Sequence, residues 1–172
     1  MKPINFICFI FVGITLIVAG CGPKLPPGMP KLNPCKITVT MNDKPLDKAR
    51  IILYADSETG GAWGYSGYTD SSGSVNMMTD GKYKGIPAGK YSVCISRIDV
   101  EKREYKGYFE MKKLPPPKST VVVDLKFNDP DETPFHLEVT DGKRATLDCA
   151  VTESKDPNLP KNYGMPKPKK KK

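Results

Sequence analysis

The sequence predicts an all-β fold, a single antiparallel β-sandwich over residues 35–151. Two observations carry this prediction: apolar side chains recur with a period of two, and turn residues recur at short intervals. A third is that no segment of helix length shows a period of 3.6. Many short strands between regular turns are typical of sandwiches, and the segment has a common length for one core.

The alternation is clearest over residues 37–41, where apolar and polar side chains take turns, and over residues 49–53, where Ala49, Ile51 and Leu53 alternate with Arg50 and Ile52. Such a pattern predicts strands with one face in a core and one face towards water. Three consecutive prolines within residues 114–118 cannot join a central ladder and predict an exposed loop. Further strands are expected over residues 65–69, 74–79, 90–98, 104–111, 120–127, 135–140 and 145–151.

The first twenty residues have the layout of a secretory signal peptide. A short basic start from Met1 to Pro3 precedes an apolar run from Ile4 to Val18. This run is shorter than the roughly 18 to 20 apolar residues that span a bilayer, and Gly, Pro and Lys follow it. We therefore expect residues 1–20 to direct export and to be removed, and the alternative of a transmembrane helix is disfavoured.

The end of this segment, Val18, Ala19, Gly20 and Cys21, resembles the lipobox of bacterial lipoproteins. The resemblance implies that Cys21 becomes the new N-terminus and carries lipid, and each buried methylene adds about 0.8 kcal/mol of membrane affinity. The implied partner is a membrane and the implied location is the cell envelope, outside the cytoplasm. Because Gly22 stands where Asp would favour the inner membrane, the outer membrane is favoured by analogy. An ordinary signal peptide with a chance cysteine is the alternative.

The positive charge of the chain is concentrated after the expected domain. The chain carries 27 Lys and Arg against 19 Asp and Glu, and seven of the lysines lie between Lys155 and Lys172. The domain is therefore nearly neutral, which argues against nucleic acid as a partner.

We expect residues 21–34 to form a proline-rich tether and residues 152–172 to form a disordered basic tail. The tail either solubilises the chain or contacts an anionic surface.

Three motifs resemble carboxypeptidase-regulatory-like and transthyretin-like domains. Residues 44–46, KPL, and then Ala49, Ile51 and Leu53 match the pattern GxPLxGAxVxL, with Asp43 or Lys44 where those families prefer Gly. Residues 69–73, TDSSG, match TDxxG, and residues 86–91, IPAGKY, match xPAGxY. The resemblance covers most of residues 35–96 and implies the sandwich of many secreted and surface modules. Each motif has a structural interpretation, in which Asp70 accepts backbone N–H groups, Gly73 takes a positive φ and Tyr91 anchors the core.

The chain offers few residues for catalysis. His136 is its only histidine, whereas zinc peptidases and hydrolase triads need several such groups in fixed geometry. We expect no catalytic residue, no metal site and no cofactor. The predicted function is a non-catalytic binding or structural module of the envelope, with an envelope polymer or protein as partner. The alternative is a small secreted hydrolase or an accessory domain of an envelope enzyme.

Two further sets of residues are candidate sites. Trp63, Tyr65 and Tyr68 alternate with small residues and form a candidate ligand surface for a sugar or peptide, with packing inside the sheet as the alternative. Cys35, Cys94 and Cys149 remain once Cys21 carries lipid, and export permits one disulfide between them.

Alternation assigns Cys35 and Cys149 to the core face of the first and last strands, whereas Cys94 is out of phase with its apolar neighbours. The candidate disulfide is therefore Cys35 with Cys149. Three reduced thiols are the alternative, since a disulfide requires Cα atoms within about 7 Å.

Overall fold

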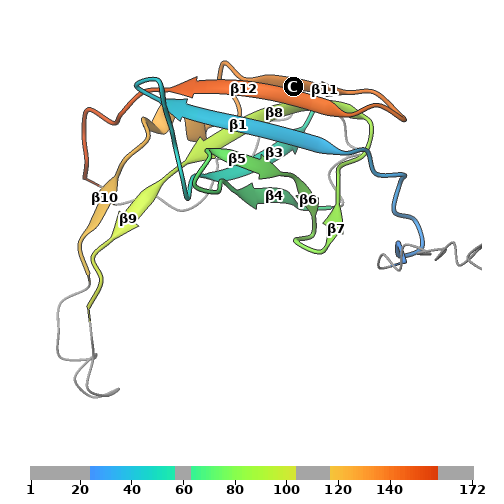
Figure 1. The fold of residues 1–172 in the computed structure, drawn as a ribbon, viewed down its shortest axis with the longest axis horizontal. Helices are drawn as coiled ribbons and strands as arrows, with labels where there is room; N and C mark the ends of the chain where they lie inside the picture. The colour runs from blue at the N-terminus through green and yellow to red at the C-terminus, as the bar shows by residue number, and fades with distance from the viewer. Residues whose placement is uncertain (1–23, 57–62, 104–116, 159–172) are drawn as a thin grey trace, which may run out of the picture.

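The computed structural model describes residues 24–56, 63–103 and 117–158. Within them the chain is almost entirely β-structure, and two sheets pack face to face as a sandwich (Figure 1). The predicted all-β fold is therefore confirmed. The elements in chain order are β1 (Cys35–Met41), β2 (Lys44–Pro45), β3 (Arg50–Ala55), β4 (Tyr65–Tyr68), β5 (Ser74–Asn76), β6 (Met78–Thr79), β7 (Tyr83–Lys84), β8 (Gly89–Ser96), β9 (Ile98–Val100), β10 (Ser119–Val121), the 3-10 helix η2 (Leu125–Asn128), β11 (His136–Val139) and β12 (Ala145–Val151).

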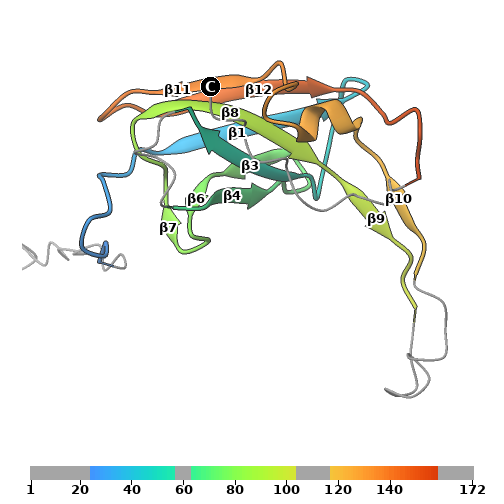
Figure 2. The same ribbon diagram turned by 180° about the vertical axis from the view of Figure 1, so that it is seen from behind.

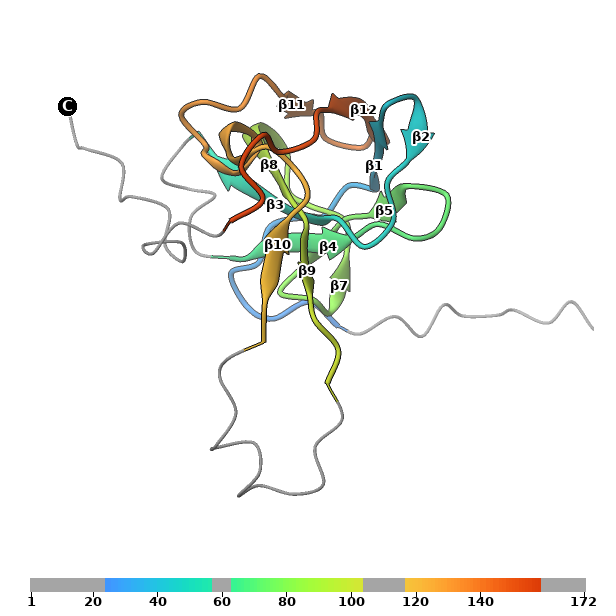
Figure 3. The same cartoon turned by 90° about the vertical axis from the view of Figure 1, so that its left-hand side faces the viewer.

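The two sheets differ in size, and a short ribbon leaves them at one end. One sheet has the strand order β12-β1-β2, with β5 also paired to β1, and the other has the order β11-β8-β3-β4-β6-β7. Figure 2 shows the molecule from behind, with β8 and β3 lying next to each other. β9 and β10 form an antiparallel ribbon that extends away from the sandwich, as the end-on view shows (Figure 3).

The first and last long strands, β1 and β12, pair in parallel. Their register runs over seven residues, from Cys35 opposite Ala145 to Met41 opposite Val151. The other pairs among the described strands are antiparallel, so the predicted antiparallel sandwich holds except at this pair. Parallel neighbours need a long crossover, and here the rest of the domain provides it. The chain therefore enters β1 and leaves β12 at opposite ends of one sheet.

The alternating apolar side chains fill the space between the sheets. Tyr91 is 1% exposed, and its hydroxyl donates a hydrogen bond to the carbonyl oxygen of Pro87 at 2.9 Å. Its ring meets the ring of Tyr65 edge to face, with centroids 5.5 Å apart, a favourable geometry for an aromatic pair. The prediction that Tyr91 anchors the core is confirmed. Other fully buried side chains include those of Ile37, Ile51, Met77, Ile86 and Ile95.

The predicted strand over residues 120–127 is wrong in its second half. β10 ends at Val121, and residues 125–128 form η2 instead. Asp124 caps this turn, because its carboxylate accepts a hydrogen bond from the backbone N–H of Lys126 at 3.1 Å. Phe127 is buried and stacks on Phe135 with ring centroids 5.5 Å apart. The predicted strand over residues 104–111 lies outside the described residues.

Contacts with the domain continue beyond both of its expected ends. Asn33 is 1% exposed, its backbone pairs with that of Ile86, and its side-chain oxygen accepts a hydrogen bond from the N–H of Gly142 at 2.7 Å. Residues 152–158 pair antiparallel with residues 120–124. Hydrogen bonds to the sandwich and its ribbon therefore extend past residues 35 and 151 on both sides. Residues 1–23, including Cys21, and residues 159–172 lie outside the described part of the chain.

Thr69, the first residue of the TDSSG motif, ties β4 to the turn before β3. Its hydroxyl donates to the carbonyl oxygen of Leu46 at 2.7 Å and accepts from the N–H of Ala49 at 2.8 Å. The side chain of Thr69 is buried, so these bonds satisfy groups that water cannot reach. Leu46 and Ala49 are themselves buried, in agreement with the apolar positions of the first motif.

Asp70 and Gly73 complete the turn as the sequence predicts. One carboxylate oxygen of Asp70 accepts hydrogen bonds from the N–H of Ser72 at 2.8 Å and of Ser74 at 3.1 Å. The hydroxyl of Ser72 donates a third bond to the same oxygen at 2.6 Å. This bond first, and then the two backbone bonds, stabilise the ionised form and lower the pKa of Asp70. Gly73 has φ +73, and its carbonyl oxygen accepts from the N–H of Val39 at 2.8 Å. The turn thus joins the end of β4 to the middle of β1 in the other sheet.

Replacing Gly73 by alanine is expected to destabilise the protein by about 2 kcal/mol or more, because a Cβ is strained at positive φ and must push a buried backbone aside. That Cβ would lie 2.5 Å from the carbonyl oxygen of Val39. Urea unfolding followed by circular dichroism measures the loss. Gly142→Ala is the matched control, because Gly142 has the same φ of +73 and nothing within 4 Å of its added Cβ. Equal losses in the two variants would show that the contact with β1 is unimportant.

Candidate functional site

The three aromatic residues of the candidate ligand surface do not share one surface. β4 alternates, so Tyr65 points into the core at 2% exposure, whereas Tyr68 is 67% exposed on the other face. Trp63 is half-buried and packs against the core. Gly67 lies between Tyr65 and Tyr68 in β4. A Cβ added to Gly67 would come within 2.5 Å of the side chain of Val75, so the missing side chain allows Val75 to pack closely against β4. The predicted surface is therefore wrong for Tyr65, and only Tyr68 offers a largely open ring.

The predicted disulfide between Cys35 and Cys149 is also wrong, although both side chains do face the core. In the parallel register Cys35 lies opposite Ala145 and Cys149 lies opposite Val39. The two cysteines are thus four positions apart along neighbouring strands, roughly 13 Å at the usual rise per residue. A disulfide needs Cα atoms within about 7 Å. Alternation identifies the face of each residue but not the register between two strands.

All three cysteines of the described residues are buried thiols. Burial raises the pKa of Cys35 and of Cys149 to about 12, and the neighbouring Asp148 adds to the effect at Cys149. Such thiols remain protonated at neutral pH and are poor nucleophiles. Cys94 is 1% exposed although it is out of phase with its core-facing neighbours, so both faces of β8 are covered at this position.

No metal centre is found within residues 24–56, 63–103 and 117–158, where no three His, Cys, Asp or Glu side chains are grouped for a cation. His136 is exposed on β11. In the same ranges no helix is long and apolar enough to cross a membrane.

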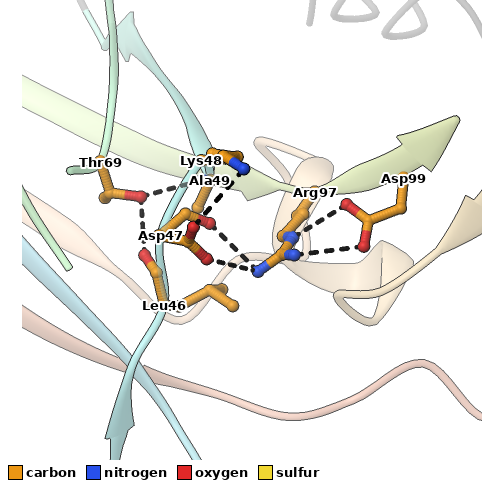
Figure 4. Close-up of polar contacts among 7 residues, drawn as sticks. All are labelled: Leu46, Asp47, Lys48, Ala49, Thr69, Arg97 and Asp99. Atoms are coloured by element: carbon orange, nitrogen blue, oxygen red, sulfur yellow. Dashed lines mark hydrogen bonds and ion pairs between the residues drawn. The ribbon is translucent and has the colours of Figure 1, made fainter. Parts of the chain in front are cut away.

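The most organised polar cluster surrounds Arg97, between β8 and β9 (Figure 4). Its guanidinium donates two parallel hydrogen bonds to the carboxylate of Asp99, from Nε at 3.0 Å and from Nη2 at 3.1 Å. Nη1 donates to Oδ1 of Asp47 at 2.9 Å and to the carbonyl oxygen of Asp47 at 3.2 Å. Lys48 adds a looser contact, with its ammonium 3.9 Å from Oδ2 of Asp47.

This Arg97 cluster connects three segments that are distant in sequence. Asp47 precedes β3, Asp99 belongs to β9, and the carbonyl oxygen of Arg97 accepts a hydrogen bond from the N–H of Val122 just after β10. The bonds to Asp99 and then the charge of Asp47 raise the pKa of Arg97, whose side chain is only 21% exposed. The N–H groups of the guanidinium donate to Asp99 in the ribbon and to Asp47 in the sandwich. These bonds hold the ribbon of β9 and β10 against the sandwich.

Sequence reasoning missed this cluster. The spacing of Arg97 and Asp99 does carry a signal, since residues two apart on an extended chain lie on the same side. Asp47, by contrast, is 50 positions from Arg97 in the chain and comes near it only through the fold.

The comparisons with known proteins add little. No family model and no curated protein matches the chain. Two solved structures are similar: a 9R-lipoxygenase from Cyanothece, with 14% identity and a TM-score of 0.32, and a candidate adhesin from Bacteroides ovatus, with 16% identity and a TM-score of 0.37. The matches cover 76% and 72% of this chain but 17% and 45% of those chains. At such scores neither likeness carries an argument about this protein.

Stability is expected to fall in alkali from about pH 9 upwards. The ordinary pKa of the two core thiols is 9.0 and the folded state raises it to about 12, so the folded chain keeps protons that the unfolded chain releases. The stability contributed by the protonated thiols is fully present below pH 9 and is lost towards pH 12, by about 1 kcal/mol per pH unit for each thiol. Urea midpoints at about pH 8, 9 and 10 measure this loss. A Cys35→Ala, Cys149→Ala variant should show a shallower decline, and an unchanged slope would contradict the assignment.

Replacing Arg97 by methionine is expected to cost about 1 to 2 kcal/mol, because it removes charge-assisted hydrogen bonds and leaves two aspartates without their common partner. Chemical unfolding of the variant measures the cost. Arg144→Met is the control, since Arg144 is exposed and its substitution should stay within about 0.5 kcal/mol. If both substitutions cost the same, the cluster does not secure the ribbon.

Proposed function

We propose that this chain is a lipid-anchored protein of the cell envelope whose β-sandwich serves as a non-catalytic binding or structural module. The observation that carries the proposal is the order of the N-terminal residues, in which an apolar run is followed directly by Val18, Ala19, Gly20 and Cys21. A cysteine at the end of that small-residue step is what the lipobox resemblance requires. The Gly22 that follows favours the outer membrane.

The position of the domain relative to Cys21 supports this proposal. Asn33 is the first residue that the fold holds by both its backbone and its side chain. It lies twelve positions after Cys21, and a segment of that length spans at most about 40 Å when fully extended. The sandwich would therefore stay close to the bilayer that holds the lipid, as expected of an envelope module on a short proline-rich tether.

The use of polar groups within the domain supports a non-catalytic role. Thr69 and Arg97 bond to neighbouring segments of the fold, Asp70 bonds within its own turn, and the hydroxyl of Tyr91 bonds to the backbone. These residues thus hold turns and strands together. The motif residues have the structural roles that a carboxypeptidase-regulatory-like module would give them, which makes a binding or scaffolding task the best supported one.

Changing Cys21 to serine is expected to abolish incorporation of labelled palmitate and to release the protein from the membrane fraction, since Cys21 supplies the thiol for the lipid. Metabolic labelling and fractionation of cells that express the full chain measure both effects. Cys8→Ser is the matched control, because Cys8 lies within the segment expected to be removed. Palmitate that persists in the Cys21 variant, or is lost in the Cys8 variant, would refute the proposal.

A further inference from the structure

The two segments that flank the domain meet it at opposite ends of one strand pair. Asn33 fixes the entry just before β1, where its backbone pairs with that of Ile86. β12 runs parallel to β1 over its whole length and ends beside Met41, roughly 20 Å further along at the usual rise per residue. Figure 1 shows this separation, with the blue segment before β1 on the right and the red segment after β12 on the left. A pull on both segments therefore acts mainly along the two strands and slides one past the other.

The ladder between β1 and β12 is continuous, so such a pull loads its hydrogen bonds together. Seven residue pairs are in register without interruption, and neither strand contains a proline or a glycine. The N–H of Ala145 donates to the carbonyl oxygen of Pro34 at 2.9 Å, so the ladder starts one residue before β1. The bonds of a parallel pair are evenly spaced along the strands. Sliding therefore strains every bond at once, whereas separation from one end breaks them one after another.

β1 is held along its other edge as well, and it is packed into the core. The N–H of Val39 donates to the carbonyl oxygen of Gly73 at 2.8 Å, and the N–H of Met77 donates to that of Cys35 at 2.9 Å. Most core-facing side chains of the two strands are buried, namely those of Cys35, Ile37, Val39, Ala145, Cys149 and Val151. Side chains in a close-packed interior must move past one another when the strands slide. Both edges of β1 and its core face thus oppose its displacement.

The chain is fastened where it enters and leaves the strand pair. At the entry, the N–H of Asn33 donates to the carbonyl oxygen of Ile86 at 2.8 Å, and the side-chain oxygen of Asn33 accepts from the N–H of Gly142 at 2.7 Å. At the exit, the carbonyl oxygen of Thr152 accepts from the N–H of Asp124 at 3.1 Å. Tension in either flanking segment therefore passes into the sheets at these points and does not first fray the ends of β1 and β12.

We propose that β1 and β12 form a mechanical clamp, and that a further function of this domain is to bear tension between the segments that flank it. Sliding bends the N–H···O=C bonds of the ladder, and hydrogen bonds weaken steeply once they are bent, so the clamp holds until its bonds fail together. Where the segment before β1 is held, as the proposed lipid on Cys21 would hold it, this pair resists a pull on the segment after β12. The clamp is a property of residues 33–152 and does not depend on the lipid.

Single-molecule pulling on the full chain tests the clamp, with handles attached to introduced cysteines. Cys8 and Cys21 are replaced by serine, and the other three thiols are buried, so the handles react with the introduced cysteines. Handles on Lys31→Cys and Thr152→Cys slide the strands. The matched control places them on Lys31→Cys and Asp141→Cys, because Lys31 and Asp141 lie 3.2 Å apart as an ion pair and a pull there separates the strands from one end. All three substituted residues are exposed.

The sliding geometry is expected to need at least about twice the unfolding force of the control at the same pulling speed, because its bonds fail together. Both variants have the same fold, so the difference reports the direction of the pull and not the stability of the domain. In the sliding geometry the two handles should also separate in one step of roughly 400 Å, the extended length of the chain between them less their initial distance. A single step means that β1 and β12 are the element that resists.

Equal unfolding forces in the two geometries would overturn the inference. Release of chain in several steps before the highest force would overturn it too, because another element would then carry the load. Neither result bears on lipidation, which the labelling of the Cys21 variant tests separately.

Discussion

The parallel pairing of β1 with β12 is the constraint on which the rest of the structure depends. It joins the two ends of the domain through seven residues in register, so the pair encloses the entire chain between them in one loop. Contacts of such sequence separation are slow to form because loop closure has a large entropic cost. The same pairing sets the four-position offset between the core cysteines and directs the two flanking segments to opposite ends of the sandwich.

The connection between the sheets is made by polar groups as well as by the core. Thr69 bonds to the turn before β3, and Gly73 bonds to β1 at a point where only a residue without a side chain fits. Arg97 extends the same principle to the ribbon of β9 and β10, since it bonds both to Asp99 in β9 and to Asp47 before β3. Each of these groups uses its hydrogen bonds to hold segments of the fold together.

The sequence predicted local features well and pairings between distant residues poorly. Alternation located the strands around Ile37 and Ile51 and the core position of Tyr91, because a period of two is a local property. It could not reveal the parallel register or the contact of Arg97 with Asp47, which exist only once the sheets are assembled. The aromatic residues of β4 were grouped by proximity in sequence, yet alternation itself sends Tyr65 and Tyr68 to opposite faces.

A distance measurement between spin labels on the two flanking segments tests the central claim most directly. Labels at residues 31 and 155 should lie more than about 20 Å apart, because β1 and β12 run parallel between them. Labels at residues 31 and 141 should be close, since Lys31 and Asp141 form an ion pair at 3.2 Å. A long distance for the first pair and a short one for the second is the predicted result. Similar short distances for both pairs would mean that the two strands do not run parallel and that the chain ends lie together.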